Sequence, residues 1–193
     1  MELFKQKLIL GSSSPRRQQL LKDAGFTFKT VSINADESFS SNLKAQEIPL
    51  YLAEKKAKHY PDNLNDDEIL ITSDTVVWVD GVVLNKPENE FEAKQMLQFL
   101  SGKMHQVFTG VCITSNKKQI SFYDETKVFF KPLTEEEIIF YIKNYKPFDK
   151  AGSYGAQDWL GLIGIDRIEG SYFNVMGLPV HKLYEELQKF TSQ

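Results

Sequence analysis

Short apolar runs alternate with amphipathic segments along this chain, and such alternation is typical of proteins that combine helices with a sheet. The apolar runs predict strands. Two of them flank Asp80-Gly81, a dipeptide that favours the tight turn of a hairpin, so we expect a mixed sheet. The predicted strands are Leu8–Leu10, Ile69–Ile71, Val76–Val79, Val82–Leu84, Val107–Thr114 and Gln119–Lys131.

The amphipathic segments carry helix-end signals. Ser14 is a suitable N-cap before Pro15, and Gly25 can end the helix that follows. Thr134 and Glu137 have the spacing of a capping box. The stretch from Pro147 to Gly164, rich in glycine and aromatic residues, predicts loop and short strand. The predicted helices are Pro15–Ala24, Pro49–Tyr60, Glu88–Leu100, Thr134–Asn144 and Val180–Phe190.

The run from Gly11 to Arg17 combines a strand end, serines and two arginines at a helix start. Arg16 and Arg17 fall in the first turn, where the helix dipole disfavours cations by about 0.3–1 kcal/mol each. A bound phosphate removes this conflict, because N–H groups, hydroxyls and guanidinium groups all suit its oxygens. An ordinary solvated first turn is the alternative.

Two further positions carry candidate chemistry. Lys56 shares a helix face with Ala53 and Ala57, so it is expected to point inward, where it either meets an anion, pairs with a carboxylate such as Glu37, or snorkels outward. Asp74 follows an apolar run, at a strand end where metal ligands and bases occur, although a turn-forming aspartate is also common there.

Lys86, next to Pro87, adds a cation, and Asp36-Glu37 adds carboxylates. One or two carboxylates together with substrate phosphates are the usual ligands of magnesium. These residue types supply cations for phosphates, acids for a metal and a candidate base for water.

Composition narrows the class of protein. The 193 residues suit one domain, and a net charge of −3 argues against a nucleic-acid polymer as partner. Cys112, the single cysteine, lies in an apolar run and is expected in the core. The chain shows no signal peptide, membrane span, P-loop, Rossmann or nucleophile-elbow motif, and His59, His105 and His181 lack zinc spacing. We therefore expect a cytoplasmic protein with surface or structural histidines.

Together, these blocks resemble the Maf family of nucleotide pyrophosphatases, and they occur in family order over nearly the whole chain. The matching blocks are Leu10–Arg17, Asp36-Glu37, Leu52–Ala57, Ser73–Val77, Lys86-Pro87, Leu100–Gly102, His105–Val107, Asp149–Gln157 and Gly170–Pro179.

The resemblance implies a fold and a reaction. The implied fold is an elongated, Maf/ITPase-like α/β domain over residues 1–193, with a mixed, twisted central sheet, flanking helices and a deep cleft between two lobes. The implied reaction cleaves a nucleoside triphosphate to the monophosphate and pyrophosphate with a divalent metal, Mg or Mn. A homodimer is also implied.

The resemblance also implies roles for individual residues. Asp74 is the implied catalytic residue, and with Glu37 the implied metal ligand. The substrate-binding residues are Ser12, Arg16, Arg17, Lys56 and Lys86.

Three positions point to the branch of the family that resembles dTTP/UTP pyrophosphatases: Arg16, Thr75 and Gln157. A side-chain amide such as that of Gln157 matches the donor and acceptor edge of uracil or thymine. Lys55, Ser73 and Asp158-Trp159 depart from the family pattern, the last where glycine is common. A nucleotide-binding regulator of septum formation and a pyrophosphatase for methylated purines such as 7-methyl-GTP are the alternatives.

Overall fold

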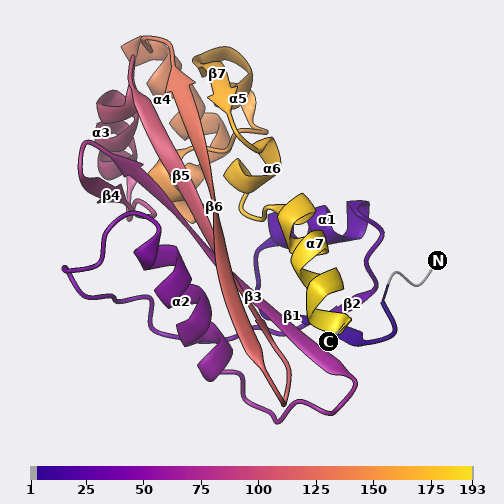
Figure 1. Ribbon diagram of the computed structural model, residues 1–193. Helices are drawn as coiled ribbons and strands as arrows, with labels where there is room; N and C mark the ends of the chain where they lie inside the picture. Colours follow the sequence, from indigo (N-terminus) through magenta and orange to yellow (C-terminus); the bar gives the residue numbers. More distant parts are fainter. Residues whose placement is uncertain (1–3, 193) are drawn as a thin grey trace. The chain divides into compact units, whose positions relative to one another are not determined.

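The computed structural model describes residues 4–192, and the chain divides into two compact units. Unit 1 comprises the residues up to Asp74, Thr109–Asp124 and the segment from Gly177 onward. Unit 2 comprises Thr75–Phe108 and Glu125–Met176. Three long strands, labelled in Figure 1, contribute residues to both units: β3 (Glu68–Val79), β5 (Met104–Thr114) and β6 (Gln119–Phe130).

Within the described part of the chain, seven strands form one mixed sheet with the order β2-β1-β3-β5-β6-β7, and β4 pairs with β3. Strand β1 is parallel to both β2 and β3, whereas β4 and β7 are antiparallel to their partners. The mixed sheet is thus confirmed. The shorter strands are β1 (Lys7–Leu10), β2 (Phe28–Thr30), β4 (Val82–Leu84) and β7 (Ile165–Glu169).

The helices of unit 1 begin and end close to the predicted residues. Helix α1 (Pro15–Asp23) is capped by Ser14, and Gly25 adopts a φ of +80° just beyond it. Helix α2 (Glu47–Lys58) begins before Pro49, which is tolerated because Pro49 lies in the first turn, where backbone N–H groups have no helical partner. Helix α7 spans Val180–Thr191.

Helix α2 packs closely on the sheet. Its Ala53 and Ala57 meet Ile9, Leu70 and Cys112 in one apolar cluster. Cys112 is fully buried, as expected for a core residue.

Gly110 in β5 permits this close approach, and its replacement is a first test of the packing. A Cβ there would lie 2.4 Å from the backbone carbonyl carbon and oxygen of Pro49. Gly110→Ala must therefore push α2 from the sheet, and we expect it to lower the free energy of unfolding by roughly 1–3 kcal/mol in urea titration. Thr114→Ala, at the end of the same strand, is the control. A Gly110→Ala change below about 0.5 kcal/mol contradicts the close contact.

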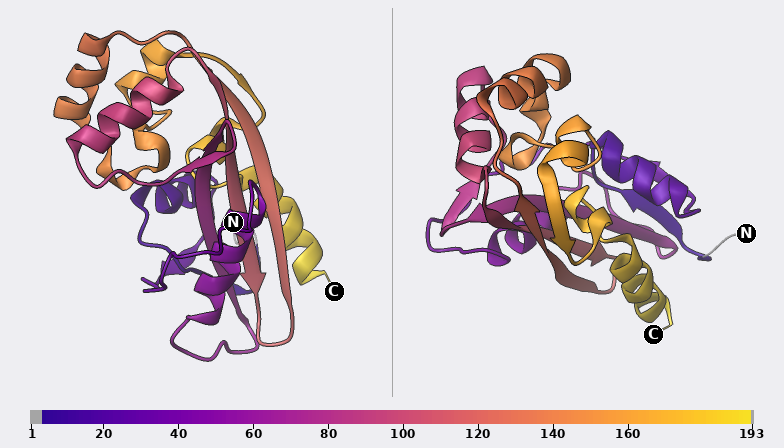
Figure 2. Two further views of the ribbon diagram at one scale, coloured as in Figure 1. Left: turned by 90° about the vertical axis from the view of Figure 1, so that its left-hand side faces the viewer. Right: turned by 90° about the horizontal axis from the view of Figure 1, so that it is seen from above.

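Unit 2 has its own core, in which residues of β3, β5 and β6 meet four helices and two 3₁₀ turns. Figure 2 shows α3 and α4 side by side. The capping box of Thr134 and Glu137 is confirmed. The elements are α3 (Glu90–Leu100), α4 (Glu135–Tyr145), the turns Pro147–Asp149 and Ala151–Ser153, α5 (Trp159–Gly164) and α6 (Tyr172–Val175).

The predicted short strand before Gly164 is wrong. The segment from Trp159 forms helix α5, and strand β7 begins only at Ile165. The reason is packing: Leu160 is fully buried and joins the apolar cluster of unit 2, while Leu162 is exposed. Trp159 and Ile163 pack against the same cluster, so most of the apolar side chains of this short helix face the core and Leu162 alone points away from it.

His105 is a buried structural residue of unit 2. Its imidazole lies edge-on to the rings of Phe130 and Tyr154, and its Nε2 is 2.6 Å from the Tyr154 hydroxyl oxygen. Burial lowers the pKa of His105 to about 3 and raises the pKa of Tyr154. Of the two roles expected for this histidine, surface or structural, the structure shows the structural one.

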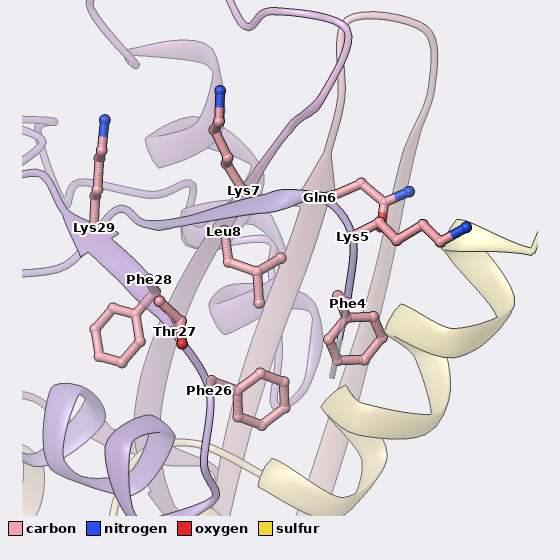
Figure 3. A pocket seen from close by; sticks show the side chains of 9 residues that line it. All are labelled: Phe4, Lys5, Gln6, Lys7, Leu8, Phe26, Thr27, Phe28 and Lys29. Atoms are coloured by element: carbon pink, nitrogen blue, oxygen red, sulfur yellow. The ribbon is translucent and has the colours of Figure 1, made fainter. Parts of the chain in front are cut away.

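A small hollow lies at the edge of the sheet in unit 1, beside β1 and β2. Figure 3 shows Phe4 and Phe26 facing each other in it; their ring centroids are 5.8 Å apart and the rings are nearly parallel. None of the residues implicated by the sequence lines this hollow. None of the helices between residues 4 and 192 is long and apolar enough to cross a membrane.

Candidate active site

Asp74 does not lie at a strand end, as the sequence suggested, but inside the continuous strand β3. The strand continues because Thr72 and Ser73, although polar, are fully buried within the sheet. The Asp74 side chain is 12% exposed. A carboxylate this enclosed requires a charged or hydrogen-bonding partner.

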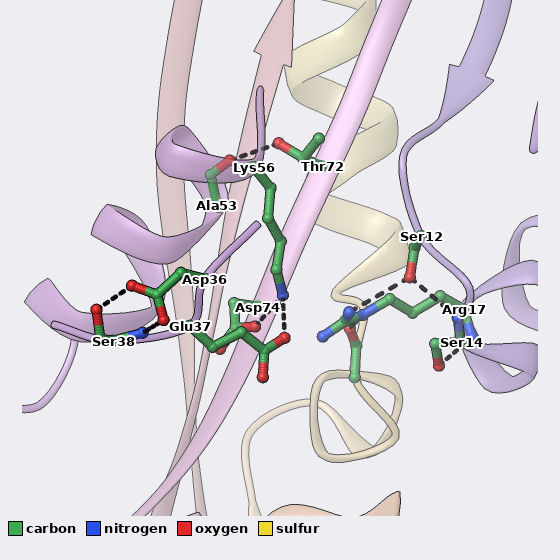
Figure 4. Close-up of polar contacts among 11 residues, drawn as sticks. Ser12, Ser14, Arg17, Asp36, Glu37, Ser38, Ala53, Lys56, Thr72 and Asp74 are labelled. Carbon is green, nitrogen blue, oxygen red and sulfur yellow. Dashed lines mark hydrogen bonds and ion pairs between the residues drawn. The ribbon is translucent and has the colours of Figure 1, made fainter. Parts of the chain in front are cut away.

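That partner is Lys56, which extends from α2 toward β3 (Figure 4). Its Nζ lies 2.5 Å from Oδ1 of Asp74 and 2.9 Å from Oε1 of Glu37. The predicted inward direction of Lys56 is confirmed, with a side chain 11% exposed. The predicted pairing with Glu37 is also present, so Lys56 joins two carboxylates rather than one.

Thr72 fixes the helix against the strand at this point. Its hydroxyl donates a 2.7 Å hydrogen bond to the carbonyl oxygen of Ala53, and both groups are buried. Thr72 and Asp74 share one face of β3 because side chains two apart in a strand point the same way. Ala53 and Lys56 are likewise neighbours on α2. This hydrogen bond therefore sets Lys56 opposite Asp74.

Asp36 orders the segment that carries Glu37. Its carboxylate accepts hydrogen bonds from the hydroxyl and the backbone N–H of Ser38 and pairs with Lys55 at 3.1 Å. The contacts with Ser38, followed by that with Lys55, lower the pKa of Asp36 to about 2. Lys55, one of the departures from the family pattern, thus has a structural partner.

Arg17 and Ser12 lie on the other side of the two carboxylates in Figure 4. Nε of Arg17 donates to the carbonyl oxygen of Gly177 at 2.8 Å, and Nη1 reaches Oγ of Ser12 at 3.5 Å. Burial lowers the pKa of Arg17, and the nearby carboxylates of Asp74 and Glu37 oppose this shift. Arg17 and both carboxylates therefore act on one another electrostatically.

Arg16, which follows Pro15 in the first turn of α1, is partly buried. Its positive charge further lowers the pKa of Arg17. The two cations therefore repel each other at this helix start. A polyanion placed there would relieve this repulsion.

Unit 1 thus brings together five of the residues that the sequence implicated: Ser12, Arg17, Glu37, Lys56 and Asp74. Sequence reasoning missed Thr72, Asp36 and Gly177 as residues that position them. Thr72 could have been found by its place two residues before Asp74. The contact between Gly177 and Arg17 has no local signal.

Thr75, Lys86 and Gln157 belong to unit 2. Gly152 connects their segments: its N–H donates to the carbonyl oxygen of Asn85 at 3.1 Å, and a Cβ on it would lie 3.0 Å from Val77. Lys86 is exposed, and Thr75 and Gln157 are partly buried. The segments that carry Thr75 and Lys86 therefore meet at Gly152, five residues before Gln157.

The carboxylates of unit 1 fit a divalent cation only in part. Oxygen atoms of Glu37 and Asp74 converge on the Lys56 ammonium, so they already surround a positive charge. Within residues 4–192, however, no group of three or more acidic, histidine or cysteine side chains forms a complete metal site. Two carboxylates completed by substrate phosphates are the pattern that magnesium uses.

Comparison with known proteins places these residues in a family. The chain is 54% identical to a dTTP/UTP pyrophosphatase of Phocaeicola vulgatus over 97% of both chains. It is 51% identical to one of Cytophaga hutchinsonii, over 97% of this chain and 85% of the relative. The Staphylococcus aureus Ham1 protein shares the fold, with a TM-score of 0.52 at 12% identity over 95% of this chain and 99% of that one. The family model for Maf-like proteins matches residues 7–190, and this chain belongs to that family.

Proposed function

We propose that this protein is a nucleoside triphosphate pyrophosphatase that hydrolyses dTTP and UTP to the nucleoside monophosphate and pyrophosphate. The observation that carries the proposal is the contact of Lys56 with both Asp74 and Glu37, beside the guanidinium group of Arg17. Cations and acids gathered in this way suit a substrate that is a polyanion. The relatives at about 50% identity carry the same activity in their names.

In the proposed reaction, Asp74 accepts a proton from the attacking water. A bond forms between the water oxygen and the α-phosphorus, and the bond to the bridging oxygen breaks, so that pyrophosphate leaves. Arg16, Arg17, Lys56 and Lys86 neutralise the charge that develops on the phosphate oxygens. When bound, a divalent cation such as Mg²⁺ or Mn²⁺ supplies further positive charge, and Glu37 and Asp74 are the residues proposed to hold it.

Recognition of the base is assigned to Arg16, Thr75 and Gln157, the positions that distinguish the pyrimidine branch. Oε1 of Gln157 is buried and has no hydrogen-bond partner among residues 4–192. An unpartnered buried carbonyl oxygen costs about 1–3 kcal/mol. A base N–H that meets it recovers part of this cost, which supports a role in binding.

A nucleotide panel tests the activity. Incubation of dTTP, UTP, 7-methyl-GTP and ITP with Mg²⁺ or Mn²⁺ should give monophosphate and pyrophosphate, with dTTP and UTP favoured by roughly 10-fold or more. EDTA should remove the activity. Binding without hydrolysis contradicts the proposal and favours a nucleotide-binding regulator. Preference for 7-methyl-GTP favours the purine alternative, and release of inorganic phosphate contradicts the assigned bond.

A further inference from the structure

The turn that carries Gln157 is closed on itself. The N–H of Asp158 donates to the carbonyl oxygen of Gly155 at 3.0 Å, which makes Gly155–Asp158 a β-turn with Gln157 at its third position. The direction of the Gln157 side chain therefore depends on how firmly this turn is held.

Tyr141 of α4 joins the two ends of the turn. Its hydroxyl accepts a hydrogen bond from the N–H of Gly155 at 3.1 Å and donates one to Oδ2 of Asp158 at 2.8 Å. Tyr141 is fully buried, and burial, followed by the hydrogen bond to Asp158, raises its pKa. Its hydroxyl therefore keeps its proton and stays a donor to Asp158 at neutral pH.

Lys150 holds the same carboxylate from another direction. Its Nζ lies 3.6 Å from Oδ2 of Asp158 and 2.7 Å from Oδ1 of Asp149. The side chains of Lys150 and Asp158 are only 12% and 18% exposed. Because partly buried ion pairs are screened less than surface pairs, this contact restrains the Asp158 carboxylate.

The carboxylate also lies close to the Gln157 amide. A Cβ built on Gly155 would lie 2.6 Å from Oδ2 of Asp158 and 3.0 Å from Nε2 of Gln157, so both atoms are near one point. The negative charge of this nearby carboxylate attracts the N–H side of the amide and therefore favours that orientation electrostatically over the flipped one. Orientation matters because a freely turning amide pairs with either uracil or cytosine, whose edges differ in donors and acceptors.

We propose that Asp158 is a positioning residue that fixes the Gln157 amide for recognition of uracil or thymine over cytosine. The Asp158–Tyr141–Lys150 clasp does so by holding the turn and by selecting one amide orientation. The inference rests on the proposed function and extends it to a residue at which this chain departs from the family's common glycine.

Selectivity measured in variants tests the clasp. In Asp158→Gly the ratio of kcat/KM for dTTP to that for CTP should fall roughly 10-fold, through KM, with kcat for dTTP within about twofold of wild type. In Asp158→Asn this ratio should fall less, because the asparagine amide oxygen can still accept the hydrogen bond from Tyr141. Tyr141→Phe should lower the ratio about as much as Asp158→Gly, because it removes the hydroxyl that joins the two ends of the turn. Asp166→Asn, an exposed aspartate of unit 2, is the control and should match wild type.

Hydrogen exchange at the Gly155 amide, followed by NMR, gives a second readout that does not depend on turnover. Both Asp158→Gly and Tyr141→Phe should exchange faster than wild type. An active wild type whose variants keep wild-type selectivity and exchange overturns the inference alone. A fall in kcat with unchanged selectivity also overturns it. A wild type that hydrolyses no nucleotide overturns the proposed function, and this inference with it.

Discussion

Asp74→Asn is expected to fold normally and to lose dTTP hydrolysis by about 10²–10⁴-fold, the usual contribution of a general base. Asparagine has nearly the same shape, and its amide oxygen can still accept a hydrogen bond from Lys56. It cannot take a proton from water. The loss should appear in kcat, because the cations that bind the phosphates remain in place.

Pyrophosphate release in steady-state assays measures this effect, with the thermal midpoint of unfolding as the check on folding. Asp67→Asn is the matched control: Asp67 is an exposed carboxylate just before the same strand and pairs with Lys7 at 2.8 Å. It should keep wild-type turnover. Near-normal release of pyrophosphate by Asp74→Asn refutes the catalytic role of Asp74.

The two carboxylates that meet Lys56 differ in a way that separates their roles. The Asp74 side chain lies in the sheet and is 12% exposed, whereas that of Glu37 lies in a loop and is 49% exposed. A proton acceptor benefits from a fixed position. A carboxylate in a loop can adjust to a cation that arrives with the substrate. This contrast supports Asp74 as the base and Glu37 as a ligand only.

Elements with strong local signals were predicted closely. Ser14 caps α1, and Thr134 and Glu137 form a capping box at the start of α4. Asp80 and Gly81 both adopt the positive φ that the hairpin turn requires. In each case the signal and the structure involve residues within four positions of each other. Local chemistry decides such features without help from the rest of the chain.

Features set by tertiary contacts were not predicted. Strand β3 continues through Asp74, where the sequence suggested a strand end, because the sheet buries Thr72, Ser73 and Asp74. The segment from Trp159 becomes a helix because Leu160 enters the core of unit 2. Strand β2 pairs with β1 through only three residues, too few to give a periodic signal.

The candidate site was found in two ways. Helical periodicity alone indicated that Lys56 points inward, and the structure confirms it. The roles of Arg16, Thr75, Gln157 and Glu37 came from the family resemblance and stay predictions, as do the metal, the homodimer and the cytoplasmic location. The clasp of Asp158 could not be found from sequence, because Tyr141 reaches it across 17 positions.

Stability should fall as the pH is lowered from 7, because of His105. Burial lowers its pKa from 6.5 to about 3 in the folded protein. The unfolded chain binds a proton at this residue below about pH 6.5, whereas the folded protein stays neutral until about pH 3. The free energy of unfolding therefore falls by about 1.4 kcal/mol for each pH unit across this window, and by about 5 kcal/mol over its whole width.

The surroundings of His105 explain why its imidazole stays neutral in the folded protein. Nε2 of His105 is engaged with the Tyr154 hydroxyl, and Nδ1 is buried without a partner among residues 4–192. A second ring proton would be enclosed by Phe130 and Tyr154 with no acceptor. Exposed carboxylates such as Asp67 and Glu135 also have lowered pKa values, but they weaken folding only as the pH falls toward their ordinary values near 4.

The interval between pH 7 and pH 5 consequently isolates His105, and about 2 kcal/mol should be lost across it. Urea titration at both pH values measures the loss. His105→Asn is expected to be less stable throughout, since it leaves a cavity, yet its stability should change far less between the two pH values. His181→Asn, an exposed histidine on α7, should keep the wild-type dependence. If His105→Asn loses as much stability as wild type over this interval, the proton is taken up elsewhere, and the buried imidazole is not what makes the fold sensitive to acid.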